Sequence, residues 1–168
     1  AAWISTLFRR LDRDARFARP LIQALEADPA HAMAAEHGHL QIDAPVSGGV
    51  KGADAGTLAF MVGCDEPEFA RIEAALEPMS RITIRAGDHG AGQAAKICNN
   101  MILGVTMIAT CEAFALADKL GLDRQRMFDV VSTSSGYSWS MNAYCPAPGV
   151  GPTSPADNGY KPGFAAEL

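Results

Sequence analysis

The stretch GAGQAAKICNNMILGVTMIATCEAFALADKLG, residues 90–121, decides the fold. From Gln93 to Leu120 it contains no proline and one glycine, and Gly121 is a residue that commonly ends helices. A helix of this length would extend about 42 Å. It is apolar on most sides, which predicts a central, buried helix.

The segment upstream of this helix reads as strand, strand, helix and strand. Pro45 is expected to end the first strand, and Pro67 suits the first turn of the helix. Together these elements indicate α/β structure. Short apolar runs, period-two alternation and helical spacing place them at residues 40–44, 57–62, 66–76 and 81–85.

The segment downstream is helical at first and then irregular. Asp123 is expected to cap a second helix over 124–131, and a turn follows. Residues 145–163 contain five prolines and four glycines, which predicts an extended, irregular segment. The predicted fold class is α/β plus all-α. We expect three parts: a divergent helical segment 1–39, strand-bearing residues 40–90, and helical residues 91–168.

Composition excludes several functional classes. The chain has 168 residues and a net charge of −5, which argues against binding a nucleic-acid backbone. Its four cysteines are far apart in sequence, which predicts no zinc site and favours a reducing compartment. The longest uninterrupted apolar run, residues 101–111, is shorter than a bilayer needs, so no membrane association is expected.

The helix start carries a motif that resembles a dinucleotide fingerprint. Residues 90–95 fit G-x-G-x-x-A, and Glu112 stands 20 residues beyond Gly92. In a true fingerprint the acidic residue ends a second strand, whereas Glu112 lies within the same helix. The glycines are therefore better explained by close packing at the start of the helix.

Lys96, Asn99 and Asn100 interrupt the apolar pattern of this helix. Lys96 and Asn100 are four residues apart and share one face. Burial and the positive helix end both disfavour the ammonium form of Lys96, so it could exchange a proton as a general acid or base. The alternative is a lysine that extends to solvent, with both asparagines capping a neighbouring loop. Spacing alone favours that alternative.

A second candidate site follows the first strand. Ser47, Gly48 and Gly49 offer a hydroxyl and closely spaced backbone N–H groups, which a carboxylate could approach closely. Taken alone, the same residues are more simply explained as a turn between two elements.

The two candidate sites together carry a resemblance. DAPVSGG (43–49), GTLAFMVG (56–63) and GAGQAAKICNNM (90–101) resemble the β-hydroxyacid dehydrogenase family. SSGYSWSMNAYCPAPGV (134–150) and NGYKPGF (158–164) are similar to members that oxidise 3-hydroxyisobutyrate in valine breakdown. The resemblance covers residues 36–168, and its blocks occur in the family's order.

The resemblance implies the C-terminal strands of an NAD-binding Rossmann-type domain, a long interdomain helix and an all-helical domain. It implies that Lys96 is the catalytic acid–base, that Asn100 fixes the substrate hydroxyl, and that Ser47–Gly49 hold the substrate carboxylate. Trp139 is expected to wall the pocket on the substrate side and Phe164 on the cofactor side.

The resemblance also predicts the reaction and its setting. The expected reaction is NAD-dependent oxidation of 3-hydroxyisobutyrate to methylmalonate semialdehyde. The expected partners are a small hydroxyacid and further copies of the same chain, without nucleic acid or metal. The expected location is the cytoplasm of a bacterium, or the mitochondrial matrix of a eukaryote.

Two departures from the family keep alternatives open. Residues 1–39 lack the opening G-x-G-x-x-G, with Gly38 as their one glycine, and the family's later K-D-L block is missing. We therefore expect an incomplete enzyme that, alone, neither binds NAD tightly nor turns over substrate. The alternatives are a reductase of tartronate or succinic semialdehyde, and an inactive fragment that acts as a helical association module.

Overall fold

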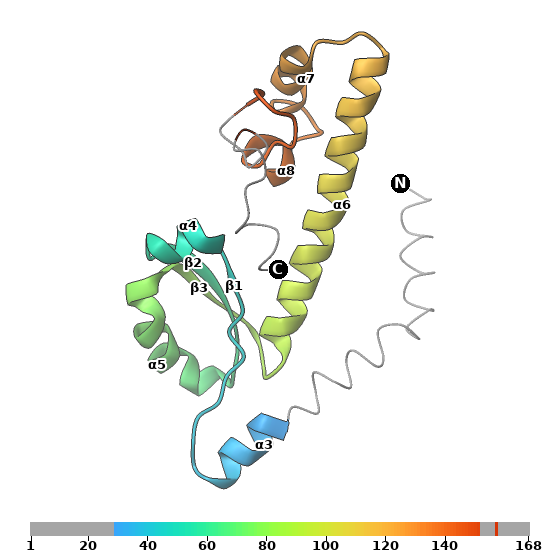
Figure 1. Cartoon of the computed structure of the whole chain (residues 1–168). Helices are drawn as coiled ribbons and strands as arrows, with labels where there is room; N and C mark the ends of the chain where they lie inside the picture. The colour runs from blue at the N-terminus through green and yellow to red at the C-terminus, as the bar shows by residue number, and fades with distance from the viewer. Residues whose placement is uncertain (1–28, 152–156, 158–168) are drawn as a thin grey trace, which may run out of the picture. The chain divides into compact units, whose positions relative to one another are not determined.

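A computed structural model describes residues 29–151 and 157 (Figure 1). The chain divides into two compact units, residues 1–97 and 98–168, each described here by itself. In the first unit the described elements are α3 (Pro29–Glu36), β1 (Val46–Ser47), α4 (Gly49–Asp54), β2 (Leu58–Gly63), α5 (Glu66–Leu76), the 3-10 turn η1 (Glu77–Met79), β3 (Ser80–Gly87) and the start of α6 (Ala91–Lys119). In the second unit they are the rest of α6, α7 (Arg124–Val131) and α8 (Trp139–Asn142).

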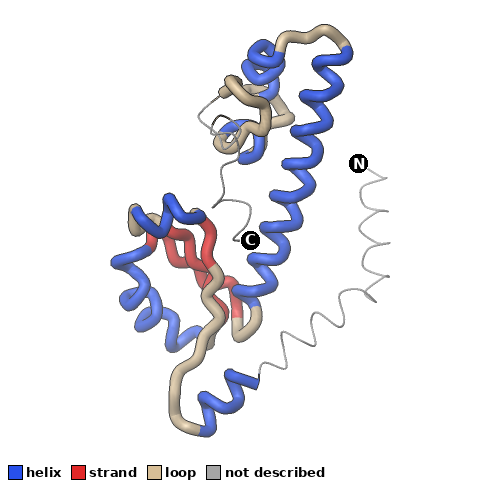
Figure 2. The backbone as a smooth tube through the Cα atoms, viewed as in Figure 1, coloured by secondary structure: helices blue, strands red, loops and turns tan. Residues whose placement is uncertain are grey.

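The first unit contains a three-stranded sheet in the order β1-β2-β3. β1 pairs antiparallel with β2, whereas β2 and β3 run parallel. The strands are the red segments of Figure 2. Parallel neighbours need a crossover, which α5 supplies. The buried residues of this unit lie on β2, the residue after it, and α5: Phe60, Val62, Cys64 and Ile72. The α/β part of the predicted fold class is confirmed.

The first predicted strand is placed wrongly. Residues 40–44 form one isolated bridge, between Asp43 and Gly63, and the strand β1 lies after Pro45. The proline does not end the pairing, because its carbonyl accepts a hydrogen bond from Met61 N at 3.0 Å. Proline lacks only the donor, so an edge strand can continue through its acceptor side.

The second unit is a small helical cluster. α6 ends at Lys119, and Gly121, two residues further on, has a φ of 71°, the left-handed conformation typical of a helix stop. Asp123 caps α7 as predicted and accepts a hydrogen bond from Arg126 N at 3.0 Å. Ser138 caps α8, which the sequence did not predict, through Met141 N at 3.1 Å. The hydrophobic core of this unit is formed by Phe114, Ala117, Met127, Met141, Cys145, Ala147 and Val150.

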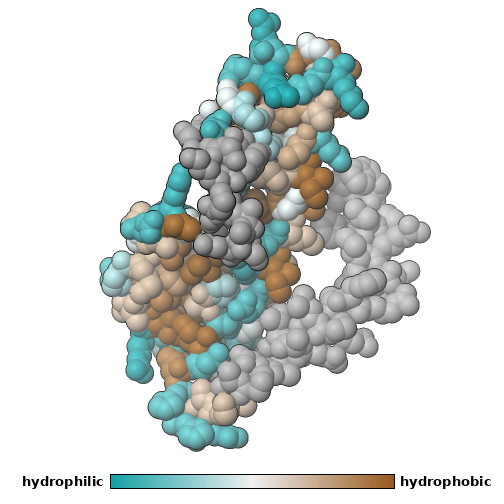
Figure 3. All heavy atoms as spheres, in the orientation of Figure 1, coloured by the Kyte–Doolittle hydropathy of each residue, from teal (hydrophilic) through white to brown (hydrophobic). Residues whose placement is uncertain are grey.

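α6 is less buried than predicted. Apolar side chains are visible along it in Figure 3. Among the described residues only a minority of its length is covered, so the prediction of a central, buried helix is wrong for this chain. Large apolar side chains that are 56–64% exposed belong to Met101, Ile102, Val105, Ile108 and Leu116.

By length and composition α6 could also cross a membrane. The sequence prediction counted only the uninterrupted apolar run, residues 101–111, and so missed this property. The polar residues that bound that run, Asn100 and Glu112, do not lower the hydropathy of the longer helix enough to exclude a span. Core helices of globular domains share the same length and composition, so the finding by itself assigns no membrane.

Candidate functional site

The side chain of Lys96 reaches the segment that was predicted to bind a carboxylate. Its Nζ donates a hydrogen bond of 2.7 Å to the carbonyl oxygen of Val46, the residue before Ser47. Lys96 is partly buried in the second turn of α6. Both residues belong to the first unit. Two predicted site segments, 50 residues apart in sequence, therefore meet in space.

The loop after β1 has a backbone that needs glycine. Gly48 has a φ of 141° and Gly49 a φ of 60°, backbone conformations that residues with a Cβ rarely adopt. A Cβ on Gly48 would also meet Leu58 Cδ2 at 3.0 Å. Ser47 is partly buried, and both glycines are exposed. The loop thus presents backbone and one hydroxyl to solvent.

Asn100 lies one helical turn beyond Lys96 on α6 and belongs to the second unit. Its side chain is exposed, and its Oδ1 accepts from Asn99 Nδ2 at 3.4 Å. Among the described residues neither asparagine side chain forms a hydrogen bond to a neighbouring loop, so the predicted capping role has no support. Both side-chain amides are exposed and could instead contact a ligand.

The two predicted aromatic residues are placed differently. Trp139 begins α8 in the second unit, is 52% exposed, and stacks on Tyr144 with ring centroids 4.9 Å apart. Stacking holds one face of the indole and leaves much of the ring accessible. Phe164 lies outside the described residues.

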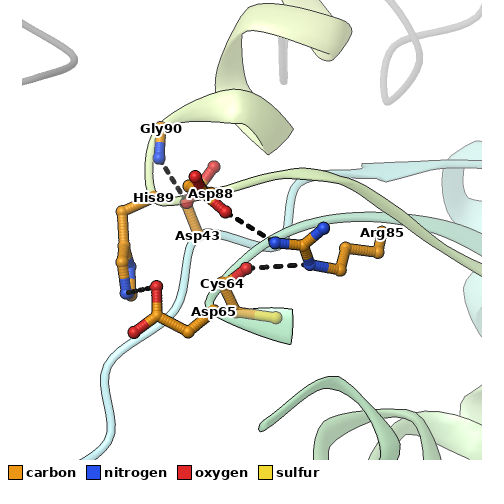
Figure 4. Close-up of polar contacts among 7 residues, drawn as sticks. All are labelled: Asp43, Cys64, Asp65, Arg85, Asp88, His89 and Gly90. Carbon is orange, nitrogen blue, oxygen red and sulfur yellow. Dashed lines mark hydrogen bonds and ion pairs between the residues drawn. The ribbon is translucent and has the colours of Figure 1, made fainter. Parts of the chain in front are cut away.

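Sequence reasoning missed Asp43, which joins the sheet to the start of α6 (Figure 4). Its Oδ1 accepts from Gly90 N at 2.8 Å and its Oδ2 from Gln93 N at 2.9 Å. A helix start leaves N–H groups without intrahelical partners, and a carboxylate is a favoured acceptor for them. The signal was present in the sequence: an aspartate opens the DAPVSGG block, and a glycine-rich helix start lies downstream.

The fingerprint-like residues 90–95 do not fit a dinucleotide. The carboxylate of Asp43 occupies the place where a pyrophosphate would accept hydrogen bonds from the helix start. A Cβ on Gly92 would lie 2.7 Å from Asp43 Oδ2 and would overlap the carbonyl of Met61. The glycine therefore allows close packing, as the sequence predicted, and this helix start offers no cradle for a nicotinamide cofactor.

Charged residues surround the turn between β3 and α6 (Figure 4). Arg85 donates from Nε to Cys64 O at 3.0 Å and pairs with Asp88 at 2.6 Å. Burial is the main cause that raises the pKa of the Cys64 thiol, and Arg85 partly opposes it. Asp65, Glu68 and His89 place potential metal ligands within 4.8 Å of one another, an arrangement that is also common without a metal.

Two family models match the chain, and together they cover most of it. Residues 90–168 match a model described as the NAD-binding of NADP-dependent 3-hydroxyisobutyrate dehydrogenase. Residues 21–98 match the NAD binding domain of 6-phosphogluconate dehydrogenase. The second match begins upstream of residue 36, so the family region extends further toward the N-terminus than the quoted blocks.

Curated relatives agree with these matches. A probable 3-hydroxyisobutyrate dehydrogenase of Mycobacterium tuberculosis is 56% identical over 147 residues, which are 88% of this chain and 50% of the relative. The 3-hydroxyisobutyrate dehydrogenase of Pseudomonas aeruginosa is 55% identical over 135 residues, 80% of this chain and 45% of the relative.

A solved structure also agrees. The 3-hydroxyisobutyrate dehydrogenase of Mycobacterium tuberculosis, described with L-serine, superposes with a TM-score of 0.75 at 59% identity. The superposition covers 80% of this chain and 46% of that chain. The chain is therefore similar over most of its length to 3-hydroxyisobutyrate dehydrogenases, and both matching family models describe NAD-binding domains. It spans about half the length of these relatives.

Proposed function

We propose that this chain supplies the proton-transfer and substrate-binding residues of a dehydrogenase that oxidises a small 3-hydroxy acid, with 3-hydroxyisobutyrate as the first candidate. One observation carries the proposal. The Nζ of Lys96 lies 2.7 Å from the carbonyl of Val46, directly beside the open loop Ser47–Gly49. An amine and a carboxylate-binding loop next to each other match the two ends of a hydroxy acid.

Lys96 acts on the hydroxyl group in this proposal. Oxidation of an alcohol to a carbonyl releases the hydroxyl proton, and a neutral lysine amine can accept it as a general base. Asn100, one turn further along α6, has an exposed amide that would orient the same hydroxyl. A bound nicotinamide cofactor would supply the acceptor for the hydride that leaves the carbinol carbon, and only the hydroxyl proton is assigned to described residues.

Ser47, Gly48 and Gly49 bind the carboxylate. A hydroxyl and exposed backbone N–H groups are suitable donors to an anion, and the absence of Cβ atoms allows close approach. Trp139, which is 52% exposed, is proposed from the family resemblance to line the pocket on the substrate side. Phe164 is proposed to serve on the cofactor side.

L-serine is a second candidate substrate. The solved relative from Mycobacterium tuberculosis is described with L-serine. L-serine and 3-hydroxyisobutyrate share a carboxylate and a hydroxyl on the third carbon, and differ by an ammonium in place of a methyl group. Lys96 would therefore contact the hydroxyl, and the loop Ser47–Gly49 the carboxylate, in either substrate.

Two further properties accompany the proposal. The exposed apolar residues of α6 favour a homo-oligomer in which another copy covers them. Cys64, Cys98, Cys111 and Cys145 are free, which suits a reducing compartment such as bacterial cytoplasm or the mitochondrial matrix. The division at residues 39 and 90 stays a prediction.

The test uses the dehydrogenase that carries this sequence, with NAD or NADP and either 3-hydroxyisobutyrate or L-serine. Absorbance of the reduced nicotinamide reports turnover. Ser47→Ala removes one donor to a charged group, so we expect the KM of the hydroxy acid to rise about tenfold or more. Thr57→Ala, on the surface after α4, is the control and should leave it unchanged. If Ser47→Ala instead raised only the KM of the nucleotide, the loop would belong to the cofactor.

A further inference from the structure

We propose that Asp43 is a positioning residue: its carboxylate holds the start of α6 against the sheet and thereby places the amine of Lys96 beside Ser47. The inference rests on the proposed function of Lys96. It concerns residues of the first unit alone, and none of the comparisons assigns a role to this aspartate.

Asp43 is bonded to the sheet and to the helix at once. Its backbone forms an antiparallel bridge with Gly63, through hydrogen bonds of 2.8 Å and 3.3 Å. Its carboxylate accepts from Gly90 N at 2.8 Å and Gln93 N at 2.9 Å. Four hydrogen bonds therefore fix this residue, two on each side.

The carboxylate lies in a slot that two glycines leave open. A Cβ on Gly63 would overlap Asp43 Oδ1, and a Cβ on Gly92 would lie 2.7 Å from Asp43 Oδ2. Gly92 also packs against the carbonyl of Met61 on β2. An ordinary helix cap needs only an acceptor, whereas this arrangement also fixes the distance between helix and sheet.

The same short segment contacts Lys96. Val46, three residues after Asp43, accepts the hydrogen bond of 2.7 Å from Lys96 Nζ, and Lys96 lies one turn after Gln93. A helix is stiff over one turn, so fixing Gln93 fixes the base of the lysine side chain. Residues 43–46 thus hold both the helix start and the amine.

The first experiment measures the reaction of Lys96 with an amine-specific acylating reagent, followed by mass spectrometry of the full chain. Lys119, at the end of α6, is the internal reference. In Asp43→Ala the helix start is released, and we expect Lys96 to label several-fold faster relative to Lys119. Asp43→Asn keeps the shape and one acceptor, so its effect should be smaller. Asp88→Asn, in the same turn but bonded through its side chain to Arg85, should have no effect.

A second pair of variants separates the slot from the charge. Gly92→Ala keeps the charge of Asp43 but places a Cβ against the carbonyl of Met61 and against Asp43 Oδ2, so the helix start is forced away and Lys96 should again label faster. Gly104→Ala, on the same helix with nothing within 4 Å of its added Cβ, is the matched control. Labelling of Lys96 that stays unchanged in both Asp43→Ala and Gly92→Ala overturns the inference.

The second experiment measures kinetics in the dehydrogenase that carries this sequence. A lysine displaced by about 1 Å should lower kcat on the order of tenfold to a hundredfold in Asp43→Ala, with the KM of the nucleotide unchanged. Asp123→Ala removes the cap of α7 and should lower stability without changing kcat. If Asp43→Ala behaves like Asp123→Ala, the aspartate is only structural and the inference fails. If Lys96→Ala retains full turnover, the proposed function fails instead, and labelling alone decides whether Asp43 holds the helix.

Discussion

The two units of the chain are built by different means. In the first unit, close approaches of backbone position the chemistry: Gly63 and Gly92 admit the carboxylate of Asp43, and Lys96 reaches the carbonyl of Val46. The second unit depends on side-chain packing around Phe114 and leaves much apolar surface of α6 exposed. The comparison teaches that the site's geometry depends on positions without side chains, whereas the helical unit depends on filling its core.

The largest effect should come from the core of the second unit. Phe114 is 5% exposed, and Phe114→Ala should lower the free energy of unfolding by about 3–5 kcal/mol. Leu116→Ala, two residues away and 56% exposed, should change it by less than about 0.5 kcal/mol. Thiol exchange of Cys145, which lies in the same cluster, reports the second unit during denaturation. Equal losses from both variants would mean that this cluster is not the core.

An added methyl group should destabilise the first unit, whereas a removed side chain destabilises the second. Gly92→Ala adds a methyl group where Met61 and Asp43 leave no room, and should cost about 1–3 kcal/mol. Gly104→Ala has open space and should stabilise the helix by about 0.5–1 kcal/mol. Thiol exchange of Cys64, buried in the sheet, reports this unit. A stabilising effect of Gly92→Ala would show that helix and sheet are not in close contact.

A smaller effect is expected at the start of α7. Asp123→Ala removes the acceptor for Arg126 N, which should cost about 1 kcal/mol. The exchange of Cys145 should speed up accordingly, while that of Cys64 stays the same. Coupled changes at both thiols would show that the two units unfold together.

The smallest effect is a dependence on alkaline pH. Burial, as the largest cause, raises the pKa of Cys64 and of Cys145 above the ordinary 9.0. The folded state favours the neutral thiol. The folding stability that this preference contributes is fully present below pH 9 and is lost as the pH rises through the raised pKa. Cys145→Ala should flatten the fall of stability above pH 9, whereas Cys98→Ala, at an exposed cysteine that does not contribute to the raised pKa of Cys145, should not. An unchanged slope in Cys145→Ala would contradict the burial of that thiol.

Much of the fold was predictable because local rules decided it. The parallel strands, α5, the long helix to Gly121 and the cap at Asp123 follow from periodicity, proline placement and capping chemistry. The first strand was misplaced because a proline blocks only one side of a pairing edge. The burial of α6 was misjudged because composition tells how apolar a helix is, and not which surface covers it.

The site was predictable only in part. Lys96 and Ser47–Gly49 stood out as residue types that do not suit their neighbours, and the structure places the amine of Lys96 against Val46, the residue before that loop. Asp43 did not stand out, because its role depends on contacts with Gly90 and Gln93, which lie 47 and 50 positions further along the chain. Trp139 and Phe164 rested on the family resemblance alone, which carries no geometry.

The most direct test of the account is the turnover of Lys96→Ala in the dehydrogenase that carries this sequence. Loss of a general acid–base should lower kcat for 3-hydroxyisobutyrate by at least about a hundredfold. Lys119→Ala, at the exposed far end of the same helix, should keep the activity of the unaltered enzyme. Near-normal turnover in Lys96→Ala would contradict the central claim that the amine beside Val46 transfers the proton.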